Sequence, residues 1–292
     1  MTDASQLRSG KGSHDENFPV ASWLIKRRHR AAILAFYEFV RVADDIADHA
    51  SLSAGEKLVR LDALERSLLG EANSEPVGVT LAEALRQRGL TTKHAQDLLN
   101  AFRRDVTKLR YANWAELIDY CSLSAMPVGR FVLDVHGESR ETWAANDALC
   151  AALQIINHLQ DCAKDYRNLD RVYIPLDAMA ANGIGVEALA APKASPALLN
   201  CLHAVEGRTA ALLQQSAPFS ASISDTGLAL EVAAIQALAV RLLAMLRARD
   251  PLSQRVHLSK AGALATAASG STRELWHRLL RAAPPTKRYQ TP

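Results

Sequence analysis

The sequence is short of cysteine and of long apolar runs, and each shortage argues against a class of protein. Its four cysteines, Cys121, Cys150, Cys162 and Cys201, lie far apart without paired spacing, which argues against a disulfide framework and a zinc motif. No stretch reaches about 18 uninterrupted apolar residues, the length that a membrane-spanning helix needs, and the polar N-terminus has no apolar signal core. We therefore expect a cytoplasmic protein that is at most peripheral to a membrane.

An excess of charge of one sign is also lacking. The chain carries 34 lysines and arginines against 31 aspartates and glutamates, and the net charge of +3 is too small to favour a nucleic-acid partner. The strongest basic run spans Lys26 to Arg30. We interpret it as a solvated helix end, with a patch for anionic lipid or diphosphate as the alternative.

Alanine and leucine are abundant, within an apolar content of 49%, whereas β-branched runs are few. This composition favours an all-α fold. We expect a single domain over residues 15–283, between mobile tails over residues 1–14 and 284–292. Apolar periodicity and capping residues predict helices over about 31–48, 54–70, 79–88, 92–108, 114–124, 143–168, 197–216, 226–249, 259–268 and 274–283.

The predicted helix 143–168 carries a ladder of oxygen donors. Asn157, Asp161 and Asp165 are spaced four apart, so they share one helix face at intervals of roughly 6 Å, and Gln154 lies close to the same face. The residues before this ladder are apolar, and buried carboxylates are costly unless they are paired or bind a metal. A solvated helix face is one interpretation, and a site for Mg²⁺, which prefers oxygen ligands, is the other.

A second ladder occurs much earlier in the chain and favours the metal interpretation. Tyr37, Arg41, Asp44 and Asp48 fall on one stripe of a helix whose approach is apolar, with Asp45 next to the stripe. Two helices of this kind can face each other across a pocket. Mg²⁺ ions held between them would keep several waters and bind a substrate phosphate.

A proline and a glycine interrupt an otherwise apolar segment in the middle of the chain. Pro127 and Gly129 follow Ser124-Ala125-Met126. Proline inside a helical pattern removes a hydrogen bond and kinks the axis. The kink either serves packing or aims a freed carbonyl at a developing positive charge.

These motifs together resemble the squalene and phytoene synthases, over roughly residues 14–250. The family pattern includes an aromatic helix ending in Arg-x-x-Asp-Asp-x-x-Asp, a later Gln-x-x-Asn-x-x-x-Asp-x-x-x-Asp, and an Arg-Val-Tyr-Ile-Pro segment. Here these motifs are Arg41–Asp48, Gln154–Asp165 and Arg171–Pro175, with Tyr120-Cys121 and Val128-Gly129 matching the central helix. The resemblance implies the all-α isoprenoid synthase fold, a helical bundle with a central cavity.

Within that family, two stretches resemble the bacterial branch of the hopanoid pathway that converts presqualene diphosphate to hydroxysqualene. They are Glu16–Ser22 and Asn157–Asp161. Relatives that condense two diphosphates usually carry Arg where this chain has Gln160, and they tend to place Ser and Lys near Asn17 and Glu16. Fewer cations imply weaker capture of a second diphosphate. The alternative remains head-to-head condensation of two prenyl diphosphates.

The resemblance implies a magnesium cofactor held by residues of both ladders. For the acids of both ladders, the alternative interpretation is a solvent-exposed helix face. Asp45 either supports the metal ligands without binding the metal or is an ordinary surface acid. Arg41 would bind diphosphate with its planar fork, or form an ion pair within its own helix. The implied metal ligands are Asp44, Asp48, Asn157, Asp161 and Asp165.

Further side chains are expected around the reacting carbon and the diphosphate. Tyr37 and Tyr173 would present rings to a cation, or be ordinary core tyrosines. Gln154 would orient water or a metal-bound group, or be a buried amide. His14, Asn17, Lys164 and Arg171 are candidate diphosphate contacts, with a tail position for His14 and surface salt bridges for the last two as alternatives. Trp23, Phe36, Phe131 and Leu133 are candidate cavity linings or plain core residues.

The resemblance also implies partners in a pathway. An enzyme making presqualene diphosphate would supply the substrate, and a hydroxysqualene reductase would consume the product. A helical assembly factor that has kept the fold and lost the chemistry is the non-enzyme alternative, and the two intact ladders argue against it.

Overall fold

The computed structural model describes residues 25–282, and within them it is an all-α bundle, as predicted. The expectations for His14, Asn17, Trp23 and the two tails lie outside this range. The helices longer than one turn are α1 (Arg27–Asp48), α2 (Ala54–Leu68), α3 (Pro76–Arg86), α4 (Lys93–Thr107), α5 (Trp114–Ser124), α6 (Met126–His136), α7 (Trp143–Leu169), α8 (Leu176–Ala181), α9 (Pro196–Gln215), α11 (Thr226–Ala248) and α12 (Lys260–Ala282).

Short elements complete the connections. They are η2 (Arg140–Thr142), η3 (Val186–Ala190) and α10 (Phe219–Ser222). The only extended pairing within residues 25–282 is a single parallel bridge between Arg110 and Val172. It joins the loop before α5 to the loop after α7.

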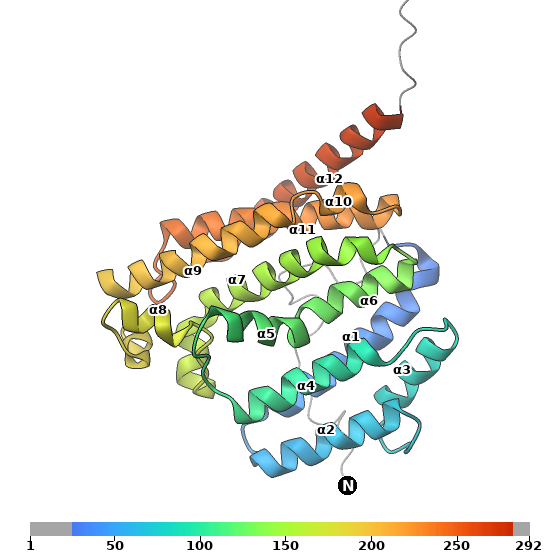
Figure 1. Ribbon diagram of the computed structural model, residues 1–292, viewed down its shortest axis with the longest axis horizontal. Helices are drawn as coiled ribbons and strands as arrows, with labels where there is room; N and C mark the ends of the chain where they lie inside the picture. Colours follow the sequence, from blue (N-terminus) through green and yellow to red (C-terminus); the bar gives the residue numbers. More distant parts are fainter. Residues whose placement is uncertain (1–24, 283–292) are drawn as a thin grey trace, which may run out of the picture.

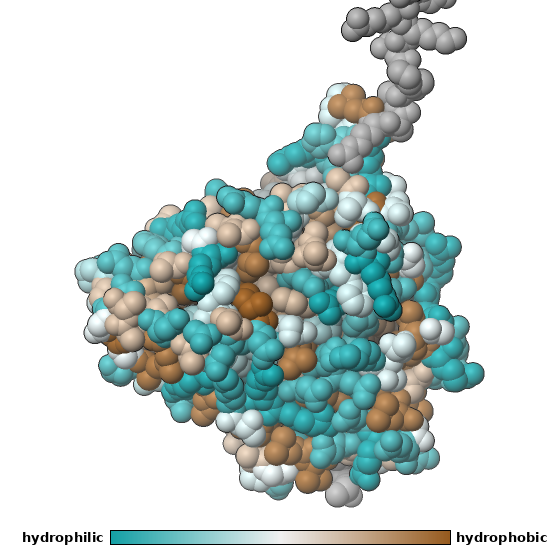
Figure 2. Space-filling view, viewed as in Figure 1, coloured by the Kyte–Doolittle hydropathy of each residue, from teal (hydrophilic) through white to brown (hydrophobic). Residues whose placement is uncertain are grey.

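Two apolar cores build the bundle. One is formed by helices α1 to α4 together with Phe131 and Val135 of α6. The other is formed mainly by α5 to α7, α9 and α11. Figure 1 shows α1 to α4 gathered at one end of the molecule, α5 to α7 in the middle and α9, α11 and α12 at the opposite end. The face of the molecule shown in Figure 2 is mainly hydrophilic, with hydrophobic residues scattered over it.

Local sequence signals account for several helix ends. Ser53 and Glu56 form a capping box at the start of α2, in which each side chain satisfies a backbone N–H of the other. Gly70 and Gly89 follow α2 and α3 with φ of 77° and 63°, a conformation that side chains with a Cβ rarely adopt. These boundaries were predicted correctly.

The break at Pro127 is also observed. Helix α5 ends at Ser124 and α6 starts at Met126, with Pro127 in its first turn, where the missing N–H costs nothing. Asn146 of α7 donates a hydrogen bond from Nδ2 to the Met126 carbonyl at 3.3 Å. The kink thus lets α6 pack on α7, which supports the packing interpretation.

The prediction of two separate helices at the end of the chain was wrong. The expected helices 259–268 and 274–283 form one continuous helix, α12. Gly270 is buried in the middle of this helix. Helix α11 approaches so closely that a Cβ at this position would lie 2.5 Å from the Ala233 carbonyl oxygen. Ser271 donates to the Leu230 carbonyl at 2.9 Å. Tertiary contact therefore overrides the weak helix propensity of the Ser-Gly-Ser-Thr stretch.

The basic run at the start of α1 is only partly a solvated helix end. Lys26, Arg27 and Arg28 are exposed, as predicted, whereas His29 is buried and its ring lies 4.3 Å from that of His136. Lys26 forms an ion pair with Asp225 at 2.7 Å. The run thus also anchors α1 to the rest of the bundle.

One described helix, α11, is long and apolar enough to cross a membrane. Half of the window that meets this test is buried inside the bundle. A buried core helix meets the same test, and α11 contributes to the second apolar core. Its composition follows from this packing.

Candidate active site

A cavity of about 570 Å³ lies where the two cores meet. Side chains of α1, α4, α5, α6, α7 and α11 line it, so segments far apart in the sequence form its walls. Most of this lining is apolar. Phe36 of α1 and Phe131 of α6 stack with ring centroids 3.9 Å apart, and Leu133 also lines the cavity. The predicted positions of these three residues are therefore observed.

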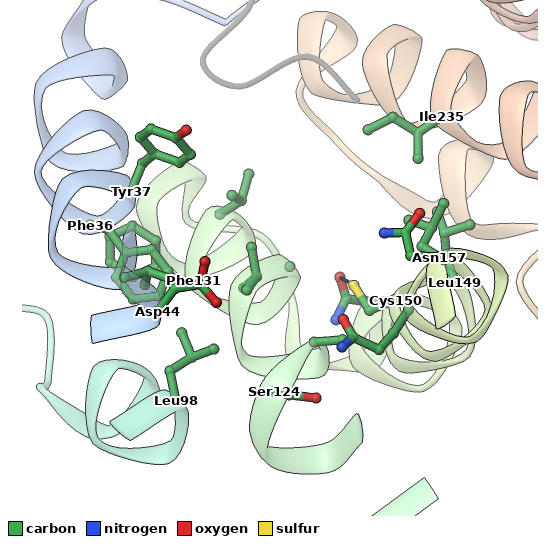
Figure 3. Close-up of a pocket in the computed structure, with 18 of the residues that line it drawn as sticks. Phe36, Tyr37, Asp44, Leu98, Ser124, Phe131, Leu149, Cys150, Asn157 and Ile235 are labelled. Carbon is green, nitrogen blue, oxygen red and sulfur yellow. Dashed lines mark hydrogen bonds between the residues drawn. The ribbon is translucent and has the colours of Figure 1, made fainter. Parts of the chain in front are cut away.

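The acidic ladder of α1 borders this cavity. Tyr37, Arg41, Asp44 and Asp48 all line it, because their spacing of four, three and four keeps them on one face of the helix. Figure 3 shows Phe36, Tyr37 and Asp44 on α1 at one side of the cavity. Asp45 is not among the lining residues and is 7% exposed.

The ladder of α7 borders the cavity from the other side. Gln154, Asn157 and Asp165 line it, and Figure 3 shows Asn157 and Cys150 opposite α1. Asp161 is half-buried and is not part of the lining, although its charge acts on Asp165. Lys164 is exposed and lies outside the lining.

The carboxylates of the two ladders interact. Burial and the charge of Asp48 raise the pKa of Asp44 to about 7, although Arg41 opposes the shift. Burial and the charge of Asp161 raise the pKa of Asp165 to about 7, and Asp48 adds to this shift from across the cavity. Asp48 therefore acts on carboxylates of both helices. The ladders converge on one place, where their negative charge is incompletely neutralised.

Two arginines connect the acids to the fold. Arg41 holds Asp44 at 3.1 Å and Asp45 at 3.0 Å, which is the ion pairing within α1 considered from the sequence. Arg171, from the loop after α7, is buried and binds Asp48 at 2.6 Å and the Ala47 carbonyl at 3.3 Å. The salt bridge considered as the alternative for Arg171 is observed, but it is partly buried and joins the end of α1 to the loop after α7.

A polar wall of the cavity combines the predicted Tyr173 and Tyr120 of the central-helix motif with Asp105, which sequence reasoning missed. Asp105 of α4 accepts hydrogen bonds from Tyr120 at 2.7 Å and Tyr173 at 3.1 Å, and all three line the cavity. Burial raises the pKa of Asp105 to about 6, against the opposing effects of Arg171 and the two hydroxyls. The sequence did contain a signal, because Asp105 continues the apolar stripe of Leu98 and Phe102 on α4.

His158 is a second residue of this wall that the sequence did not single out. Its ring stacks on Tyr173 with centroids 3.5 Å apart, and its Nε2 lies 3.0 Å from Nε2 of Gln154. Burial and the nearby Arg171 lower the pKa of His158 to about 3, so the ring is neutral at physiological pH. A neutral ring nitrogen accepts the amide hydrogen of Gln154 and leaves the amide oxygen as an acceptor.

Gln160 does not line the cavity. It is buried, and its side-chain amide donates to the Val256 carbonyl. The side chain therefore anchors α7 to the segment before α12. It brings no charge to the acidic end of the cavity.

The donor set suits a hard divalent cation. Carboxylate and amide oxygens gather at the acidic end of the cavity. Among the lining residues, Cys150 and His158 are the cysteine and the histidine, too few for a zinc-type set of ligands. Within residues 25–282, no group of three or more His, Cys, Asp and Glu side chains is close enough to enclose a metal ion. Such a cation would therefore need further oxygen ligands from substrate or water.

An all-α bundle with an apolar cavity, closed at one end by carboxylates of two facing helices, defines an enzyme class. Such a site suits an apolar chain whose anionic head group is joined to the carboxylates by a divalent cation. The family model of squalene/phytoene synthase matches residues 12–262. The chain belongs to the squalene/phytoene synthase family and is an enzyme of that family.

Individual relatives support this assignment. The chain is 61% identical over 258 residues to a hydroxysqualene synthase of Rhodopseudomonas palustris, with 88% of each chain covered. It is 55% identical over 259 residues to a hydroxysqualene synthase of Sinorhizobium fredii, with 89% of each chain covered. The crystal structure of squalene synthase HpnC from Alicyclobacillus acidocaldarius matches with a TM-score of 0.72 at 30% identity, over 84% of this chain and 92% of that chain.

Proposed function

We propose that the protein converts presqualene diphosphate to hydroxysqualene and releases diphosphate, in a magnesium-dependent reaction. The observation that carries this proposal is the convergence of two acid-bearing helices at one end of an apolar cavity. The names of the relatives at 61% and 55% identity support the choice of substrate.

The proposed magnesium ligands are Asp44 and Asp48 on α1 and Asn157, Asp161 and Asp165 on α7. The raised pKa values of Asp44 and Asp165, about 7 in each case, indicate that their ionised forms need positive charge nearby. Mg²⁺ held by these residues would supply that charge and would neutralise the diphosphate leaving group. A few carboxylates from each helix suffice, because Mg²⁺ usually keeps water and binds substrate phosphate.

Basic side chains near the acids are the proposed diphosphate contacts. Arg41 and Arg171 already lie beside Asp44 and Asp48, so their charge is fixed in place before substrate arrives. Lys164 is adjacent to Asp165 in sequence and its charge lowers the pKa of that acid. His14 and Asn17 remain proposed contacts from the segment before α1.

The apolar part of the cavity holds the isoprenoid chains and excludes water. The stacked rings of Phe36 and Phe131 lie on its wall, and Tyr37 lines it beside them. Ring faces stabilise a carbocation electrostatically without reacting with it. Exclusion of stray water keeps the cation intact while it rearranges.

The polar wall is the proposed place of water capture. Gln154 is held by His158, which in turn stacks on Tyr173, so the amide is fixed where it can orient one water molecule. The water oxygen forms a bond to the cationic carbon, and the proton it loses passes to the released diphosphate. The neutral ring of His158 adds no positive charge to repel the cation.

The proposal also places the protein in a reaction sequence and a compartment. The substrate requires an enzyme that joins two prenyl diphosphates, and the alcohol product is a substrate for a reductase. We propose a cytoplasmic enzyme that meets the membrane peripherally.

Separate incubations with presqualene diphosphate and farnesyl diphosphate, each with Mg²⁺, test the function. We expect diphosphate and hydroxysqualene from the first substrate and no product from the second. Asp44→Asn and Asp165→Asn should each lower turnover roughly a hundredfold. Asp119→Asn changes an exposed acid outside the cavity lining and should leave turnover unchanged. Presqualene diphosphate or squalene formed from farnesyl diphosphate would identify a condensing enzyme instead.

A further inference from the structure

Helix α12 carries a row of large apolar side chains that the described part of the bundle does not cover. Leu264, Leu275, Trp276, Leu279 and Leu280 are 42–72% exposed. At 1.5 Å per residue the row extends over roughly 24 Å. We call these five residues the α12 apolar face. Single exposed apolar residues are ordinary, but five large ones on one helix form an apolar surface of the kind that binds another molecule.

The opposite side of α12 is firmly packed, so the apolar face is held outward. Gly270 lies against the Ala233 carbonyl of α11, and Ser271 donates to Leu230 of α11. Arg278 pairs with Glu274 at 2.8 Å and donates to the Ile223 carbonyl at 2.5 Å. These contacts fix the rotation of the helix. Burying the apolar face would therefore require something outside the described bundle.

The end of α12 also projects beyond the rest of the molecule. Figure 1 shows its last turns extending past α10 and α11, and Figure 2 shows hydrophobic side chains at this protruding end. A helix that projects in this way can lie on a flat surface, such as a membrane, without the rest of the protein having to contact that surface. The family match ends at residue 262, so nearly all of α12 lies outside the segment that identifies the family.

The charge around this face has one sign. The exposed charged side chains of α12 within the described residues are Lys260 and Arg273, whereas the acid of this helix, Glu274, is buried and pairs with Arg278. An apolar face with tryptophan and leucine beside basic residues matches the interfacial layer of an anionic membrane, where apolar side chains enter the acyl boundary and cations meet lipid phosphates. Two copies of this helix placed face to face would bring like charges together.

We propose that the α12 apolar face docks the protein onto the surface of an anionic lipid bilayer. The helix lies in the plane of the interface, with Trp276, Leu279 and Leu280 inserted among the lipids. This docking rests on the peripheral membrane contact proposed above and assigns it to one helix, but it is independent of the proposed reaction because lipid binding is measured without turnover. It would bring the cavity close to the phase in which long isoprenoid chains dissolve.

Flotation with lipid vesicles tests the proposal on the full-length protein. We expect the protein to float with vesicles that contain phosphatidylglycerol, to float much less with pure phosphatidylcholine, and to dissociate as salt rises. The triple variant Trp276→Ser, Leu279→Ser, Leu280→Ser should lose roughly tenfold or more in vesicle affinity. The control Val59→Ser, which removes an exposed apolar side chain from α2, should bind like the wild type.

Other occupants of the face give different outcomes. Failure of the wild type to bind anionic vesicles at low salt, or equal binding by the triple variant, contradicts the proposal. A wild-type dimer that the triple variant turns into a monomer, by light scattering, would assign the face to a second copy. A clear fall in melting temperature of the triple variant would assign it to another segment of the same chain. Either result would overturn the membrane assignment.

Discussion

At the scale of single residues, two buried acids show how hydrogen-bond partners and nearby charges decide whether a buried carboxyl group is stabilised. Asp105 is surrounded by hydroxyl donors from Tyr120 and Tyr173 and by the charge of Arg171. Glu206 of α9 is 1% exposed, and its Oε2 has no hydrogen-bond partner within residues 25–282. Burial raises the pKa of Glu206, while the charges of His203 and Arg247 only partly oppose this effect. The first acid is part of the polar wall, whereas the second destabilises the fold.

We predict that Glu206→Gln stabilises the protein at alkaline pH by about 1 kcal/mol. Because the folded-state pKa of Glu206 is raised, its ionisation costs stability as pH increases through that pKa. The gain should therefore be small at pH 5 and larger at pH 8. Thermal denaturation of both proteins at the two pH values measures it. A gain that is independent of pH would contradict this explanation.

His158 provides a test of water capture. In His158→Phe the ring still stacks on Tyr173, but Gln154 loses the acceptor that orients its amide. We expect diphosphate release to stay within about tenfold of wild type, while the product shifts from alcohol toward hydrocarbon formed by proton loss. Mass analysis of the products measures this ratio. His203→Phe, an exposed substitution on α9, should leave it unchanged, and an unaltered ratio in His158→Phe would remove His158 from the water site.

The metal-ligand candidates were within reach of sequence reasoning, because their spacing of three or four repeats on two helices. Asp105 and His158 were not predicted. An isolated acid or histidine in a sequence usually lies at the surface or in the ordinary core. Only the structure shows that Asp105 and His158 line the cavity. For Arg171 the sequence left a diphosphate contact and a surface salt bridge open, because a loop arginine gives no sign of the helix end that it will meet.

At the scale of secondary-structure elements, Arg171 joins the end of α1 to the loop after α7. We predict that Arg171→Met lowers the free energy of unfolding by roughly 2–3 kcal/mol, because Asp48 loses its buried partner. Arg110→Met removes an ion pair to Asp170, whose side chain is 66% exposed, and should cost less than about 1 kcal/mol. Urea unfolding of the two variants measures the difference. Equal losses would show that the Arg171 bridge is no more important than a surface pair.

Close packing of α6 on α7 depends on Gly129. An added Cβ would lie 1.9 Å from Oδ1 of Asn146 and 2.7 Å from the Cys150 sulfur, so the buried Asn146 side chain would have to give up its place against Met126 or the helices would have to shift. We predict that Gly129→Ala destabilises the protein by about 1–3 kcal/mol. Gly207→Ala meets no atom within 4 Å and should instead stabilise α9 by about 0.5–1 kcal/mol. Melting temperatures of the two variants should therefore move in opposite directions.

Most helix positions were predictable from capping residues and apolar periodicity, as α2 and α7 illustrate. The continuous α12 was missed because its middle is held by contacts with α11 that the local sequence does not encode. The break between α5 and α6 was visible as Pro127. The hydrogen bond that Asn146 donates to the Met126 carbonyl at this break is a contact that only the structure shows.

At the scale of the whole molecule, the cavity depends on both apolar cores. Asp44 and Phe36 come from the core of α1 to α4, whereas Asn157 and Ile235 come from α7 and α11. Neither core forms the site alone. We propose that the chain folds as one domain for this reason, with the cavity as the space where the two cores meet.

The most direct measurement of the central claim is a turnover of presqualene diphosphate in water labelled with heavy oxygen. With Mg²⁺ present, we predict release of diphosphate and a C30 alcohol whose oxygen comes from the labelled water. Chelation of the metal should stop both, and added Mg²⁺ should restore them. Turnover that persists after chelation, or an alcohol without the label, would contradict the account of two acid-bearing helices that release diphosphate and a wall that delivers water.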